Sequence, residues 1–148
     1  MANDAAHNFI YGCNDDRFEE VMVYHHLDKT QRKLQSLGFT GSSSVYARPI
    51  PVHAHFAPGC NAFYSPIDVG LHFFDGGVSP DDPCPGGYVT DSAEDADVII
   101  HEYGHALQAD ITPGWGFGAA LAVDEALSMG EGFADFLQAV MSGDPCVS

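Results

Sequence analysis

Two histidines and a glutamate in the segment VIIHEYGHALQ have the types and spacing of a metal site. On a helix, His101 and His105 share one face, with Cβ atoms about 5–6 Å apart. Two imidazoles placed in this way can converge on one Zn²⁺ at Zn–N distances of about 2.0–2.1 Å. Glu102 is rotated by about 100° from His101, so it flanks the ion instead of binding it. This position suits a general base that takes a proton from water activated by the metal.

A third ligand is expected from the segment SMGEGFADFL, where Glu131 and Asp135 again lie four residues apart. A catalytic zinc site has three protein ligands and one open position, and Glu131 can supply the third ligand. Asp135 can accept a hydrogen bond from the far nitrogen of a ligating imidazole and so fix its tautomer. The alternative is that both segments are solvated helix faces. The apolar run at 98–100 and three small residues that permit close helix approach favour the zinc site: Gly130, Gly132 and Ala134.

Three helices and a group of short strands are expected to position these residues. The first helix covers about residues 15–37, and Gly38 is its stop signal. Its apolar face consists of Val23, Leu27, Thr30, Leu34 and Leu37. A second helix, with Ser92 and Asp95 as capping residues, carries the first motif over about 93–109. A third helix covers about 124–141 and carries the second motif.

Residues 41–90 are broken often by Gly and Pro, and Val, Ile, Tyr and Phe fill the gaps. This pattern predicts short strands in SVYARPIPVHAHF, NAFYSP and DVGLHFFDGG. The order of helix, strands, helix and helix predicts an α+β fold. His53 and His55 alternate on the first of these strands and so point to one side. Solvent-facing histidines are the favoured interpretation, and a second metal pair is the alternative.

The chain of 148 residues is long enough for one domain with a core. Its formal net charge of −16 argues against nucleic acid and anionic membranes as partners. It contains no run of 18 apolar residues that would span a membrane. The start, MANDAAHNFIYG, lacks the basic and apolar regions of a secretory signal. We expect a secreted protein, of which this chain is the mature portion. A solvated acidic surface is the favoured interpretation of the charge, and binding of hard cations by its carboxylates is the alternative.

The four cysteines form no CxxC pair, which argues against a structural zinc site of that type. An even number in a loop-rich acidic chain suggests two disulfides formed in an oxidising compartment. Of the three possible connectivities, we favour Cys60 with Cys84 and Cys13 with Cys146. Four free thiols are the alternative.

HEYGH and GEGFADF together resemble the HExxH and ExxxD motifs of the gluzincin metallopeptidases, in particular the thermolysin-like and fungalysin-like groups. The resemblance implies that His101, His105 and Glu131 bind zinc. It also implies that Glu102 is the catalytic base and that Asp135 orients His101. The activity implied is zinc-dependent hydrolysis of peptide bonds inside a peptide or protein substrate.

Further segments resemble the same enzymes. DVIIHEYGH is similar to the thermolysin-type approach DVVAHE, which implies a calcium ligand at Asp97 and Ca²⁺ as a second cofactor. NAFYSP is similar to the NAFW edge strand, which implies that Asn61 and Ala62 hold the substrate backbone. An edge strand offers unpaired N–H and C=O groups to an extended peptide. The fold implied is a short mixed sheet with an edge strand along the cleft, backed by the long N-terminal helix.

Two departures from the family limit the activity that we expect. The family's catalytic tyrosine has no match, and by spacing its position is Ala122. The chain ends at Ser148, before the C-terminal helical subdomain that carries the family's transition-state histidine. We therefore expect a zinc endopeptidase subdomain, and the alternative is a catalytically weak zinc-binding fragment or pseudoenzyme that binds peptide. A closed structural zinc site is disfavoured because only three protein ligands are present.

The third helix would also expose apolar side chains if the helical subdomain is absent. Phe133, Phe136 and Leu137 are the residues concerned. An exposed patch of this kind favours self-association.

Overall fold

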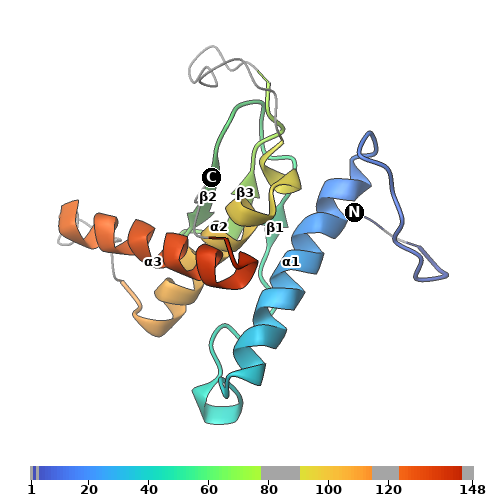
Figure 1. The fold of residues 1–148 in the computed structure, drawn as a ribbon. Helices are drawn as coiled ribbons and strands as arrows, with labels where there is room; N and C mark the ends of the chain where they lie inside the picture. The colour runs from blue at the N-terminus through green and yellow to red at the C-terminus, as the bar shows by residue number, and fades with distance from the viewer. Residues whose placement is uncertain (1, 3, 78–90, 115–123, 145–148) are drawn as a thin grey trace.

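Three helices and a three-stranded sheet make up the fold of the computed structural model, which describes residues 2, 4–77, 91–114 and 124–144 (Figure 1). The predicted α+β class is confirmed. None of the helices that the structure describes is long and apolar enough to cross a membrane. In chain order the elements are α1 (Arg17–Ser36), η1 (Gly41–Ser43), β1 (Val52–His53), β2 (Ala62–Ser65), β3 (Gly70–Phe73), η2 (Ser92–Glu94), α2 (Ala96–Ile111) and α3 (Asp124–Ser142).

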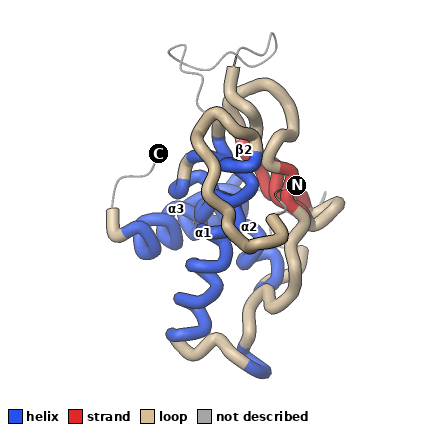
Figure 2. Tube along the Cα trace, turned by 90° about the vertical axis from the view of Figure 1, so that its right-hand side faces the viewer, coloured by secondary structure: helices blue, strands red, loops and turns tan. Residues whose placement is uncertain are grey.

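The sheet is mixed, with the strand order β1-β3-β2, so β2 lies at an edge as predicted. β1 runs parallel to β3, and β2 runs antiparallel to it with Ala62 opposite Phe73. The strands are short compared with the loops that join them (Figure 2). Val52 and His53 of the first predicted strand form ladder pairs with β3, and beyond them the Phe56 N–H donates to the carbonyl of Phe73 at 2.9 Å. Pro49 and Pro51 have no N–H to donate to a ladder, which shortens that strand.

α1 lies beside the sheet and packs mainly against α2 and η2, and α2 lies between α1 and α3 (Figure 1). Val23 and Thr30 on the predicted face are buried, and Leu27 and Leu34 pack against the core. Leu37 is 58% exposed because the helix already ends at Ser36. The next residue, Gly38, has a φ of +100°, as its predicted role as a stop requires.

α2 begins three residues later than predicted, and Ser92 is not its cap. Residues 92–94 form the separate turn η2, and the Asp95 side chain caps α2 by accepting N–H groups of Asp97 and Val98. The Ser92 hydroxyl lies 2.9 Å from the backbone oxygen of Asn61 and 3.0 Å from that of Phe74. The reason for the difference is that Ser92 ties η2 to the ends of β2 and β3, while the extended backbone of Asp95 separates η2 from α2.

The cysteines differ in part from the expected pairing. Cys13 is a free, exposed thiol, so the expected disulfide with Cys146 is not formed. A count of cysteines carries no information about the distance between two sulfurs, which a disulfide fixes. Cys60 is disulfide-bonded. Its pairing with Cys84 stays a prediction, because Cys84 and Cys146 lie outside the described residues.

Candidate active site

A close contact between α2 and α3 sets the geometry of the site. A Cβ placed on Gly104 would lie 2.9 Å from Cα and 3.2 Å from Cβ of the buried Ala134. One turn away, a Cβ on Gly130 would lie 3.2 Å from Oε1 of Gln108. Gly130 and Ala134 therefore permit close approach as predicted. Gly132 does not contribute, because its Cβ position faces open space.

This contact brings the three predicted zinc ligands together. Nε2 of His101 lies 3.2 Å from Nε2 of His105 and 3.2 Å from Oε2 of Glu131. The remaining distance, from His105 Nε2 to Glu131 Oε2, is 3.5 Å. A tetrahedral site with ligands about 2.0–2.1 Å from Zn²⁺ has edges of about 3.3–3.4 Å. The triangle of ligand atoms therefore fits one zinc ion.

Asp135 lies where it can fix the ring of His101. Its Oδ1 is 2.9 Å from His101 Nδ1. When Nδ1 carries the proton and donates it to this carboxylate, Nε2 keeps its lone pair for a metal. His105 is also held in the form that ligates metals, because burial lowers the pKa of its imidazole. Both rings thus present Nε2 toward Glu131.

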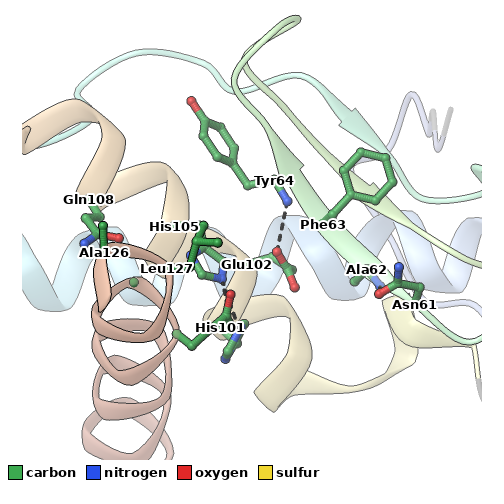
Figure 3. Close-up of a pocket in the computed structure, with 12 residues that line it drawn as sticks. Asn61, Ala62, Phe63, Tyr64, His101, Glu102, His105, Gln108, Ala126 and Leu127 are labelled. Carbon is green, nitrogen blue, oxygen red and sulfur yellow. Dashed lines mark hydrogen bonds and ion pairs between the residues drawn. The ribbon is translucent and has the colours of Figure 1, made fainter. Parts of the chain in front are cut away.

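Glu102 is on the same helix but is bound by the edge strand. It is only 7% exposed, and its Oε2 accepts the backbone N–H of Tyr64 at 2.9 Å (Figure 3). Burial raises the pKa of Glu102 to about 7, while the charge of His101 and the bond from Tyr64 oppose this effect. A carboxylate with such a pKa can exchange protons near neutral pH.

Sequence reasoning missed the part played by Tyr64. The contact uses a backbone group, which the residue type does not reveal. One signal was available. Main-chain groups alternate in direction along β2, so those of Tyr64 point to the same edge of the strand as those of Ala62.

A pocket of about 390 Å³ lies between β2, α2 and α3. Asn61 and Ala62, the predicted substrate residues, line it together with the zinc ligands. The Asn61 carbonyl accepts the N–H of Phe74 at 3.1 Å, so it points into the sheet. Main-chain groups alternate along a strand, so those of Ala62 and Tyr64 point away from the sheet. This outer edge faces the pocket. Its described lining is Asn61, Ala62, Phe63, Tyr64, His101, Glu102, His105, Gln108, Ala126, Leu127, Gly130 and Glu131.

The remaining predicted residues lie apart from this pocket. Asp97 is in the first turn of α2, and it belongs to no group of three possible metal ligands among the described residues. Its role as a calcium ligand stays a prediction. Ala122, the position expected for the family's tyrosine, lies outside the described residues.

The expected exposure of apolar residues on α3 holds in part. Phe136 is 66% exposed, but Leu137 is only 7% exposed and Phe133 packs against the core. Leu137 is rotated by about 100° from Phe136 on the helix, which turns it inward. Self-association through this face stays a prediction.

His53 and His55 are both exposed, as the favoured interpretation stated, but they do not share a site. The ring of His53 stacks on His72 with centroids 4.6 Å apart. His55 instead places Nδ1 2.9 Å from Oδ1 of Asp75. The predicted alternation does not reach His55 because β1 ends at His53.

Comparison with known proteins agrees with this geometry. The family model for fungalysin metallopeptidases (M36) matches residues 55–146. The matched region contains β2, β3, α2 and α3, and therefore every predicted zinc ligand. No curated protein and no solved structure matches the chain. Fungalysins are secreted zinc metallopeptidases. Since the match covers more than half of the chain and includes both motifs, the chain belongs to the fungalysin metallopeptidase family.

Proposed function

We propose that this chain is a zinc-dependent endopeptidase in which His101, His105 and Glu131 hold the ion and Glu102 is the general base. The observation that carries the proposal is the triangle of ligand atoms with sides of 3.2, 3.2 and 3.5 Å. When bound there, zinc supplies Lewis acidity, which brings the pKa of water to about 7 and polarises a peptide carbonyl.

Glu102 moves the proton in this proposal. Its carboxylate accepts a proton from the water that attacks the carbonyl carbon of the substrate. It then donates this proton to the amine nitrogen as the C–N bond breaks. The Tyr64 N–H leaves one carboxylate oxygen for this work, because it binds Oε2. Asp135 keeps the His101 ring in position through Nδ1.

The substrate would lie extended along the outer edge of β2. Ala62 offers outward main-chain groups, and the exposed side chain of Asn61 stands at the start of the strand. In the free protein the Ala62 N–H donates to Oδ1 of its neighbour Asn61 at 2.9 Å. A peptide carbonyl can replace that side-chain acceptor, so the edge can accept an added strand.

A second candidate function is a catalytically weak module that binds zinc and peptide. It is favoured by the lining of the pocket, which includes no Lys or Arg among the described residues. Such a cation would stabilise the oxyanion that forms on the scissile carbonyl. Loss of one oxyanion donor typically lowers kcat by about 10²–10³-fold.

We also propose two further properties for this chain. It is exported, as the members of the family are, and it binds Ca²⁺ through Asp97. Export is tested by finding the mature chain in the culture medium of its source. The calcium site is tested by Ca²⁺ titration of Asp97→Asn against the unaltered chain. Equal calcium affinity of the two would contradict a role for Asp97.

The experiment that tests the proposed activity combines metal analysis with hydrolysis of a quenched peptide. We expect about one zinc per chain, lost in His101→Ala and in His105→Ala. Glu102→Gln should keep zinc and lose hydrolysis, because an amide cannot accept the proton of water. Glu125→Gln, an exposed site on α3, is the matched control and should change neither.

The outcomes separate the candidate functions. Full zinc occupancy in either histidine variant would show that the ligand assignment is wrong. Hydrolysis that survives in Glu102→Gln would remove Glu102 as the base. Zinc-dependent peptide binding without hydrolysis in the unaltered chain would establish the second candidate.

A further inference from the structure

We propose that His55, Asp75 and Asp91 form a second metal site, for a divalent transition-metal cation such as Mn²⁺. One ligand atom from each lies within 4.8 Å of the others. His55 follows β1, Asp75 follows β3, and Asp91 precedes η2. None of the three lines the pocket of the candidate active site.

A backbone carbonyl holds one nitrogen of the His55 ring and leaves the other for a metal. Its Nε2 lies 2.9 Å from the backbone carbonyl oxygen of Asp16. A carbonyl can only accept, so Nε2 carries a proton in this contact. Nδ1 lies 2.9 Å from Oδ1 of Asp75 and donates a proton to it in the metal-free chain. Burial lowers the pKa of His55, but these two contacts outweigh it and raise the pKa. A metal ion would displace the Nδ1 proton and bind that nitrogen, while the Nε2–H keeps its acceptor, as in most metal-bound histidines.

The distance between His55 Nδ1 and Asp75 Oδ1 also fits the binding of both atoms to one metal ion. An octahedral site with ligands about 2.1 Å from the ion has edges of about 3.0 Å. The contact of 2.9 Å between Nδ1 and Asp75 matches such an edge. A small adjustment of the half-exposed Asp75 and His55 side chains would bring Asp91 onto the same ion.

A buried carboxylate beside this group provides an independent observation. Glu19 of α1 is only 7% exposed, and its Oε2 has no hydrogen-bond partner within the part of the chain that the structure describes. Its charge acts on both His55 and Asp91, so it lies within electrostatic range of them. A buried carboxylate with an unpaired oxygen is costly unless a cation compensates it. Glu19 therefore adds negative charge near a cation at this group.

The surroundings of Asp91 also carry more negative than positive charge. Burial is the largest cause that raises the pKa of Asp91 to about 6, and the carboxylates of Glu19 and Asp75 act in the same direction. The hydrogen bond from the Ala93 N–H and the charge of His55 act against them. A divalent ion would neutralise this group without a basic side chain.

The donor set selects the kind of metal. One imidazole nitrogen with carboxylate oxygens suits Mn²⁺ or Zn²⁺, whereas Ca²⁺ takes oxygen ligands. The neighbouring group of His53, Asp68 and His72 does not suit either ion. The rings of His53 and His72 are stacked at an angle of 11°, so their in-plane lone pairs run parallel and do not converge.

The test uses chain given one equivalent of Zn²⁺ and then freed of excess metal, so that the candidate active site, with two imidazoles and a carboxylate, is filled and the site at His55, with one imidazole, stays open. Zn²⁺ binds more tightly than Mn²⁺ and stays in the candidate active site. Mn²⁺ is then added in buffered salt, and free Mn²⁺ is followed by electron paramagnetic resonance. We expect the unaltered chain to take up one Mn²⁺. His55→Ala and Asp91→Asn should bind it at least 10-fold more weakly, and Glu19→Gln should also bind less.

His25→Ala is the matched control, because His25 is an exposed histidine of α1 outside this group. It should bind Mn²⁺ like the unaltered chain. Asp91→Asn keeps an oxygen that can accept the N–H of Ala93, so the start of η2 stays capped. If His55→Ala does not fold, Asp91→Asn decides: its melting temperature should not respond to Mn²⁺, whereas that of the unaltered chain should rise.

Two results would overturn the proposal. One is absence of Mn²⁺ uptake by the unaltered chain, which would leave His55 as an ordinary ion-pair partner of Asp75. The other is equal uptake by the unaltered chain and His55→Ala. The site is independent of the proposed peptidase function: His101→Ala, kept in zinc-free buffer, should lose hydrolysis and still bind Mn²⁺ at His55.

Discussion

The contact between Gly104 and Ala134 determines how closely Glu131 approaches the two histidines. In Gly104→Ala the new Cβ would lie 2.9 Å from Cα of Ala134. Carbon atoms in good contact are about 3.5–4.0 Å apart, so α2 and α3 must separate by roughly 0.6–1.1 Å at this point. Metal–ligand distances tolerate only about ±0.2 Å. We therefore expect the zinc affinity to fall at least about tenfold, which is about 1.4 kcal/mol.

The free energy of unfolding of the zinc-free protein should change less than the zinc affinity. Overpacking a core contact costs about 1–3 kcal/mol. Replacing a helical glycine by alanine returns about 1 kcal/mol. The net destabilisation of Gly104→Ala without metal is therefore about 0–2 kcal/mol. Urea unfolding in the presence of a chelator measures this quantity, and competition with a chromophoric chelator measures the zinc affinity.

Gly132→Ala is the matched control for this substitution. It is also a helical glycine close to the zinc ligands, but its Cβ position has no atom within 4 Å. It should keep the zinc affinity and raise the free energy of unfolding by about 0.5–1 kcal/mol. Unaltered zinc affinity in Gly104→Ala, with unaltered stability, would refute the view that this contact positions Glu131.

Two further predictions concern other carboxylates. Asp135→Asn should weaken zinc binding or activity by about 10–100-fold, and Glu131→Ala should weaken zinc binding more strongly; equal losses in a zinc competition assay would count against their different roles. Burial alone would raise the pKa of Asp110, but bonds from the Tyr46 N–H and Arg48 outweigh it and lower the pKa. The stability that Asp110 confers is thus present above its ordinary pKa of about 3.9 and is lost as the pH falls through the lowered value. In urea unfolding, the difference between the unaltered chain and Asp110→Asn should shrink as the pH falls toward about 3; a constant difference would contradict this.

The two motifs could be placed from the sequence because each is local. His101 and His105 are four residues apart on one helix, so helix geometry fixes their distance. The same holds for Glu131 and Asp135. The relation between the two helices is not local, and the sequence signalled it only through small residues, of which Gly130 and Ala134 lie at the contact and Gly132 does not. Glycine inside a helix costs about 1 kcal/mol relative to alanine, but Gly132 shows that its presence does not by itself mark a close contact.

Other features could not be predicted because several residues compete for the same role. Ser92 and Asp95 are both good capping residues, and only the tertiary bonds of Ser92 to the sheet show that Asp95 caps α2. The alternation that placed His53 and His55 together assumes a strand that continues. The strand ends at His53, and the two rings then find different partners.

The bond between Tyr64 and Glu102 also limits where a substrate can react. A peptide added to β2 can pair with the outward groups of Ala62, but the N–H of Tyr64 already donates to Glu102. An added strand therefore loses one hydrogen bond, the one to the Tyr64 N–H, at this end of the edge. The carboxylate of Glu102 and the zinc ligands lie at this point of the pocket. We infer that the bond between strand and base helps to place the scissile peptide bond over Glu102, since it weakens strand pairing where the proton must be transferred.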